Sequence, residues 1–144
     1  MAVRRVEPDK AAELIDAGWT YLDVRSVAEF TEGHAPGAYS IPLLDFVAGK
    51  GLMPNVNFLT EVLANFDLDS PLVVACKSGG RSARAAAILA ESGFTKVVDM
   101  RGGFYGEVDQ AGVVSCPGWA QHGLPVVPGD EPGRSYVDLR KQPR

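Results

Sequence analysis

Short apolar runs alternate with stretches of helical periodicity along most of the chain. Each apolar run has the length of a buried strand, and the runs occupy residues 3–6, 19–24, 38–41, 72–75 and 97–100. The stretches between them carry residues that start and stop helices. Strands that alternate with helices form right-handed crossovers, so the pattern predicts an α/β fold with a mostly parallel sheet and helices on both faces.

Helix boundaries are marked by specific residues. Pro8 stands in the first turn of a helix that Gly18 stops. Ser26, with Glu29 three residues later, is a capping-box pattern and predicts a short helix that starts there. Two longer helices follow, at 57–66 and 82–92.

Two segments are harder to assign. Residues 43–56 contain a Gly-Lys-Gly and a Pro-Asn sequence, so we expect a loop around a short helical turn at Leu44–Val47. Residues 1–127 are expected to form one domain, followed by a linker-like tail over 128–144. Within that tail, Tyr136–Leu139 has apolar residues suited to packing, but we expect a loose terminus.

The amino-acid composition and the spacing of charged, apolar and cysteine residues argue against several classes of protein. The formal net charge is −4, and Lys and Arg form no long run, which argues against a nucleic-acid partner or an anionic membrane. No apolar stretch has the length of a membrane span, and the first twenty residues lack a signal-peptide pattern. The two cysteines and two histidines are never at ligand spacing, so we expect neither a disulfide framework nor a structural zinc site. A reducing, cytoplasmic compartment fits best.

One stretch carries the candidate chemistry. The apolar run at 72–75 ends at Cys76, and a basic, glycine-rich loop leads from there into an Ala-rich helix. In open α/β sheets, reactive groups lie beyond the carboxyl ends of strands, where Cys76 is expected. Gly79 and Gly80 permit a loop whose N–H groups point inward, and the helix N-terminus favours an anion at the same place. These features, with Lys77 and Arg81, predict a reactive thiolate.

The segment Cys76-Lys77-Ser78-Gly79-Gly80-Arg81 resembles the active-site loop of rhodanese-type sulfurtransferases. Other parts of the chain resemble landmarks of that family in the right order, namely Leu22–Arg25 with Glu29-Phe30, Gly33–Ala38 before Ile41-Pro42, Arg101–Phe104, Trp119, and Gly123–Val126. The resemblance implies a three-layer α/β/α fold whose five strands lie in the order 3-2-4-5-1. It also marks residues 105–118 as an insertion of a length usual for functional loops.

The resemblance further implies a reaction. Cys76 would take the outer sulfur of thiosulfate or of a persulfide donor, hold it as a persulfide, and pass it to cyanide or a thiol, without a cofactor. A protein thiol is a further candidate acceptor. The residues expected to bind the donor and stabilise both sulfur anions are Lys77, Ser78, Gly79, Gly80, Arg81 and Ser82.

Several of these residues have structural alternatives. Arg81 is equally suited to clamp loop carbonyls or a nearby carboxylate, and Lys77 to be a solvated surface charge. Asp23 and Arg25 are expected to orient loops through an ion pair or backbone hydrogen bonds. His34 is expected to satisfy loop backbone groups, since the proposed reaction gives it no proton to abstract.

Cys116 lies in the insertion, which the sheet topology allows to cover the site as a lid. Two hypotheses stand: Cys116 is a resolving thiol that receives the sulfur or bonds to Cys76, or it is a packed cysteine.

Two other functions of the protein also remain open. One is a persulfide carrier, and the other is a Cys-dependent phosphatase or arsenate reductase. Loops of that last class carry five residues between Cys and Arg, whereas four stand between Cys76 and Arg81.

Overall fold

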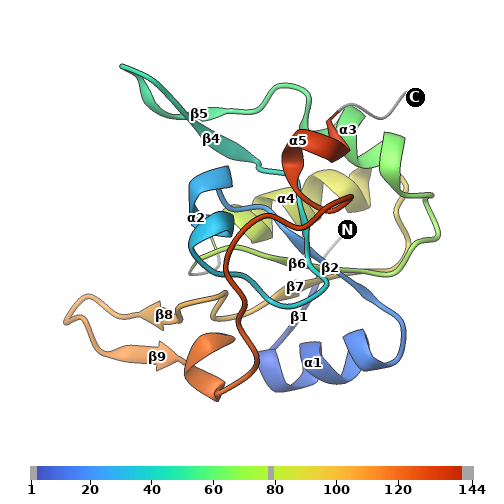
Figure 1. The fold of residues 1–144 in the computed structure, drawn as a ribbon. Helices are drawn as coiled ribbons and strands as arrows, with labels where there is room; N and C mark the ends of the chain where they lie inside the picture. Colours follow the sequence, from blue (N-terminus) through green and yellow to red (C-terminus); the bar gives the residue numbers. More distant parts are fainter. Residues whose placement is uncertain (1–2, 78–79, 141–144) are drawn as a thin grey trace.

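A computed structural model describes residues 3–77 and 80–140. Its centre is a sheet formed by β1 (Arg4–Val6), β2 (Thr20–Asp23), β3 (Tyr39–Ser40), β6 (Leu72–Ala75) and β7 (Val97–Met100). All neighbouring strands are parallel, and their order is β1-β7-β6-β2-β3 (Figure 1). When these strands are numbered first to fifth along the chain, this is the predicted order 3-2-4-5-1, which is therefore confirmed.

Helices cover both faces of this sheet, as expected. They are α1 (Pro8–Asp16), α2 (Val27–Glu32), α3 (Phe58–Asn65), α4 (Gly80–Glu91) and α5 (Tyr136–Leu139). Helix α1 lies on one face, while α3, α4 and α5 lie on the other (Figure 1). Successive strand residues point to opposite faces, so Tyr21 packs with the α1 layer and Leu22 with the α3–α4 layer.

Strand β6 lies in the middle of the sheet. Its four residues have no exposed surface, because β2 and β7 flank the strand and helices cover its two faces. A parallel strand buried on both faces requires apolar side chains throughout, which is why its sequence is Leu-Val-Val-Ala. Since Asp23 pairs with Ala75, β2 and β6 end side by side, and the residues that follow them meet at one edge.

The helix ends agree closely with their sequence signals. Helix α1 begins at Pro8 and is followed by Gly18 at a φ of 108°. In α2 both bonds of the capping box form: the Ser26 hydroxyl accepts from the Glu29 N–H, and the Glu29 carboxylate accepts from the Ser26 N–H. Helix α4 begins at Gly80, two residues before the predicted start.

The expected helical turn at residues 44–47 is wrong. This segment is β4 (Leu44–Val47), which pairs with β5 (Gly51–Pro54) in an antiparallel hairpin. Gly49 and Gly51 have φ values of 78° and 80°, which allows the chain to reverse direction in a tight turn between β4 and β5. The Asp45 carboxylate accepts the Val27 N–H at 3.0 Å, which ties the hairpin to the first turn of α2.

The apparent insertion forms a second hairpin, with strands β8 (Glu107–Val108) and β9 (Val114–Cys116). Asp109 organises its turn, because its carboxylate accepts the N–H groups of Ala111 at 2.9 Å and Val113 at 3.0 Å. A 3₁₀ turn, η1 (Ala120–His122), then brings the chain back to the sheet. There the ring of Trp119 packs edge-on against Tyr21, with 5.3 Å between ring centroids.

The tail packs along the domain as far as residue 140, contrary to the expected loose terminus. Ser40 donates its N–H to the Arg134 carbonyl at 2.9 Å, and Leu139 is 3% exposed within the core on the α3–α4 face. The Tyr136 hydroxyl donates to the Glu61 carboxylate of α3 at 2.7 Å. Leu139 and Tyr136 of this short helix therefore pack into the core. Within the described ranges, no helix is long and apolar enough to cross a bilayer.

Candidate active site

Cys76 directly follows β6 at the carboxyl edge of the sheet and is 2% exposed. Its carbonyl accepts the Phe104 N–H at 2.7 Å, and the Lys77 carbonyl accepts the Tyr105 N–H at 2.9 Å. The residues that leave β7 thus hold the base of the reactive loop in place.

The glycine pair before Phe104 makes this contact possible. Gly103 has a φ of 58°, and a side-chain carbon there would lie 2.6 Å from the Cys76 carbonyl oxygen. A side chain has no room at that position, and the backbone conformation also favours glycine. The Arg-Gly-Gly-Phe motif therefore allows the close approach of two backbone segments beside Cys76.

The Cys76 thiol contacts a chain of polar groups inside the protein. Its sulfur lies 3.5 Å from the hydroxyl oxygen of Ser82, in the first turns of α4. The Ser82 hydroxyl donates to the Asp99 carboxylate of β7 at 2.5 Å, and Arg5 donates to the same carboxylate at 3.1 Å. Burial raises the pKa of Asp99, while its bonds to Ser82 and Arg5 oppose that rise.

Sequence reasoning missed Asp99. The available signal was one acidic residue inside an apolar strand, at a position that proves to be 1% exposed. A buried carboxylate needs partners, and a strand next to the reactive loop can supply them from that loop.

The loop itself is described only in part. Ser78 and Gly79 lie outside the described residues, so the expected ring of inward-pointing N–H groups stays a prediction. Lys77 is exposed, while Ser82 is buried. The structure therefore brings Cys76, Ser82 and the start of α4 together, as predicted.

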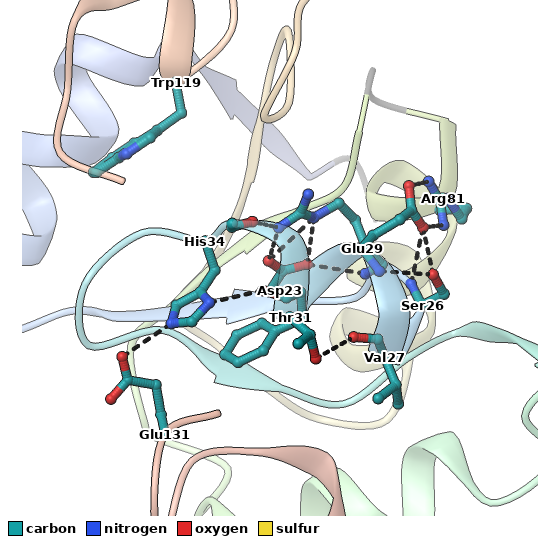
Figure 2. Close-up of polar contacts among 12 residues, drawn as sticks. Asp23, Ser26, Val27, Glu29, Thr31, His34, Arg81, Trp119 and Glu131 are labelled. Atoms are coloured by element: carbon teal, nitrogen blue, oxygen red, sulfur yellow. Dashed lines mark hydrogen bonds and ion pairs between the residues drawn. The ribbon is translucent and has the colours of Figure 1, made fainter. Parts of the chain in front are cut away.

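Arg81 pairs with Glu29 of α2 through both terminal nitrogens, at 2.7 and 3.1 Å (Figure 2). This pairing is the structural alternative that the sequence allowed for Arg81, a clamp on a nearby carboxylate. Burial would raise the pKa of Glu29, but its bonds to Arg81 and Ser26 outweigh burial and lower it to about 2. The same pairing raises the pKa of Arg81. A role for Arg81 in binding a donor stays a prediction.

Asp23 and Arg25 form a buried ion pair at the same edge, with 2.8 Å between Arg25 Nη2 and Asp23 Oδ2. Arg25 also donates to the Gly33 carbonyl at 2.7 Å and stacks over the Phe104 ring, 4.2 Å from its centroid. The expectation that this pair orients loops is confirmed. It joins the segment after β2 to the Phe104 segment that holds Cys76.

Comparisons with known proteins agree with this arrangement. The family model described as a rhodanese-like domain matches residues 7–108. The chain belongs to the rhodanese-like family. That match includes the Cys76 loop, α2 with Glu29, and the Gly102-Gly103 pair.

Individual rhodanese-like relatives are similar over most of the chain. Thiosulfate sulfurtransferase 16, chloroplastic, of Arabidopsis thaliana is 39% identical over 116 residues, which cover 81% of this chain and 86% of the relative. Thiosulfate sulfurtransferase GlpE of Ectopseudomonas mendocina is 34% identical over 101 residues, covering 70% and 81%. The crystal structure of Rv0390 from M. tuberculosis has a TM-score of 0.74 and 27% identity, covering 90% of this chain and all of that chain.

His34 of this rhodanese-like domain has a structural role, as expected. Its Nδ1 donates to the Phe30 carbonyl at 2.8 Å, and its Nε2 lies 3.0 Å from the Glu131 carboxylate (Figure 2). Its ring stacks on Phe30 at 3.8 Å between centroids. His34 therefore connects α2 to the tail.

Cys116 is buried at the end of β9, and no disulfide joins it to Cys76. Burial raises the pKa of Cys116, so its thiol form is favoured over its thiolate. A side-chain carbon at Gly102 would lie 3.2 Å from the Cys116 sulfur, so Cys116 occupies the space beside Gly102, the neighbour of Gly103. A role as resolving thiol, or of its hairpin as a lid, stays a prediction. Among the described residues, no group of three or more His, Cys, Asp or Glu could hold a metal ion.

Proposed function

We propose that the protein is a sulfurtransferase that moves sulfane sulfur from thiosulfate or a persulfide donor to cyanide or a thiol. The observation that carries the proposal is the position of the Cys76 sulfur, 3.5 Å from Ser82 Oγ at the N-terminal end of α4. A helix N-terminus favours a thiolate and, later, a persulfide anion. The names of the Arabidopsis and Ectopseudomonas relatives, both thiosulfate sulfurtransferases, support the same chemistry.

The proposed reaction has two displacements. The Cys76 thiolate attacks the outer sulfur of thiosulfate, the S–S bond of the donor breaks, and sulfite leaves with the bonding electrons. Cyanide or a thiolate then attacks the outer sulfur of the resulting persulfide, and the electrons of that S–S bond return to Cys76. Neither displacement transfers a proton from Cys76 once the thiolate has formed.

The surrounding residues would share the work of holding anions. The α4 N-terminus lies beside the reacting sulfur, whereas the Ser82 hydroxyl donates to Asp99 and accepts from the Cys76 thiol. Arg81 lies at this end of the helix, where its pair with Glu29 compensates its charge until a donor anion competes for the guanidinium. Lys77 is exposed and suited to attract an anionic donor from solution. We further propose a cytoplasmic location, where a thiolate stays reduced.

A sulfite-release assay tests the proposal. Protein incubated with thiosulfate and cyanide should release sulfite and form thiocyanate, and Cys76→Ser should do neither. Mass spectrometry of the protein treated with thiosulfate alone should find one added sulfur on the Cys76 peptide, removed by cyanide. Hydrolysis of an aryl phosphate without persulfide formation would favour the phosphatase alternative instead.

One observation favours a persulfide carrier as the second candidate. Both terminal nitrogens of Arg81 already face Glu29, which reduces its capacity to bind the sulfonate of thiosulfate. A carrier receives sulfur from a persulfide and does not need that contact. Rapid loading from a low-molecular-weight persulfide, together with very slow loading from thiosulfate, would identify a carrier.

A further inference from the structure

A cavity of about 410 Å³ opens beside the first turns of α4. We call it the α3–α4 cavity, since its walls come from those two helices and the base of the β4–β5 hairpin. Its apolar lining includes Leu43, Leu44, Val56, Phe58, Leu59 and Ile88. Sites for small organic molecules have such volumes and linings, because a mostly apolar wall removes the apolar part of a ligand from water.

Two of the three polar side chains in this lining already have partners. The Asn55 amide nitrogen donates to the Pro42 carbonyl and to the Glu61 carboxylate, each at 2.9 Å. Arg81 is paired with Glu29. Neither side chain offers its main polar groups to a ligand without giving up a bond inside the protein.

Arg84 is the third polar residue of the lining, and its side chain is exposed. Across residues 3–77 and 80–140, no carboxylate lies within ion-pair distance of Arg84. The cavity therefore combines an apolar wall with one cation whose charge is not compensated within the described protein. Its chemical complement is a molecule with an apolar body and one negative charge.

The cavity lies next to the reactive loop. Gly80 and Arg81, which end that loop, line the cavity. The Cys76 side chain belongs to the same buried cluster as Leu43 and Phe58, two residues of the cavity wall. A ligand that fills the cavity thus lies beside the loop that carries the reacting sulfur.

We propose that the α3–α4 cavity binds the sulfur acceptor, and that this acceptor is a small organic thiol with an apolar body and a carboxylate that pairs with Arg84. The inference rests on the proposed sulfur transfer. The acceptor thiolate attacks the outer sulfur of the Cys76 persulfide, whose S–S bond breaks and returns its electrons to Cys76. The acceptor leaves as an organic persulfide, so the step needs no other oxidant or reductant.

A matched pair of acceptors tests the charge requirement. 6-Mercaptohexanoate and 6-mercaptohexanol share one apolar chain and differ in the carboxylate. With persulfide-loaded protein, kcat/KM should favour the acid by up to about fivefold, the upper end of the range expected for an exposed ion pair. Arg84→Gln should remove this preference, whereas Arg4→Gln should keep it, because Arg4 is also exposed but does not line the cavity.

A second variant tests the cavity wall. Val56 lines the cavity and is 90% exposed, so Val56→Asp leaves the core intact. Its added negative charge should weaken the acid as acceptor more than the alcohol. Equal rates for both acceptors in the wild type, or a preference that survives Arg84→Gln, would overturn the inference.

Binding to Cys76→Ser separates this inference from the proposed function. In this variant, 6-mercaptohexanoate should shift the backbone amide NMR signals of cavity residues, and adding Arg84→Gln should raise the Kd obtained from these shifts by the same few-fold factor. If the wild type transfers sulfur to cyanide but the acid causes no such shifts, the cavity inference fails and the function stands. If the acid binds in an Arg84-dependent way but no persulfide ever forms, the site stands and the proposed reaction fails.

Discussion

The carboxylate of Glu29 in α2 accepts from both terminal nitrogens of Arg81 in α4, at 2.7 and 3.1 Å. One of its oxygens also closes the capping box of its own helix through the Ser26 N–H at 3.0 Å. A single carboxylate therefore fixes the start of α2 and joins it to the helix that follows the reactive cysteine.

Glu29→Gln should lower the free energy of unfolding by about 1–2 kcal/mol at neutral pH, because the charged bidentate pair is lost. The pKa of Glu29 falls from 4.5 to about 2 on folding, so this stability is fully present above pH 4.5. It is lost as pH falls towards 2, where the wild type and the variant should converge. Urea unfolding across this pH range measures the difference.

Glu32→Gln is the matched control, because Glu32 is exposed on the same helix. It should change stability by less than about 0.5 kcal/mol. A pH-independent loss in Glu29→Gln would contradict the assigned role of the carboxylate.

Gly103→Ala should unfold the region around the reactive loop or destabilise the protein by about 3 kcal/mol or more. The new methyl group would lie 2.6 Å from the Cys76 carbonyl oxygen at a φ of 58°. Thermal unfolding and the sulfite assay measure the two consequences. Gly112→Ala has a similar φ of 82° with no atom within 4 Å, so it should cost about 1 kcal/mol and leave sulfite release intact.

Ser82→Ala should destabilise the protein by about 1–2 kcal/mol, because the buried Asp99 carboxylate loses a hydrogen bond. The Cys76 thiol donates to the same Ser82 hydroxyl, a bond that holds the proton on sulfur, so iodoacetamide should alkylate Cys76 faster at neutral pH in the variant. Ser92→Ala removes a hydroxyl that, among the described residues, bonds to the Ile88 carbonyl of α4, and it should not alter this rate. Unchanged alkylation in Ser82→Ala would show that Ser82 does not tune the thiol.

Leu139→Ala should cost about 2–4 kcal/mol, since the side chain is 3% exposed in the core on the α3–α4 face. Val137→Ala, in the same short helix at 47% exposure, should cost less than about 0.5 kcal/mol. Chemical unfolding of both variants measures the difference. Equal small losses would show that the tail does not contribute to the core in solution.

The sequence predicts the sheet well because β6 and its neighbours are buried on both faces. Strands in that position consist of short, continuous apolar runs, and such runs are easily recognised in a sequence. The Ser26 capping box was equally clear, because a cap is a local feature. Residues 44–54 were misassigned because a hairpin with exposed apolar side chains has no buried face to impose alternation, and Phe46 is 64% exposed.

The sequence identifies the part of the site that is formed by consecutive residues. It does not identify the hydrogen-bond partners that come from distant parts of the chain. Cys76 and its loop could be identified from consecutive residues. The Arg81 partner lies 52 positions away, and the Ser82 partner lies 17 positions away on strand β7. Periodicity gives no information on such pairings, because they depend on how strands and helices are placed beside one another.

The backbone contact between Gly103 and Cys76 has a consequence for protein engineering. Transplanting residues 72–91 alone into another scaffold would leave behind the turn that supports the cysteine from the neighbouring strand. A functional graft needs the paired glycines and their strand as well, so the smallest portable unit of this chemistry is discontinuous in the chain.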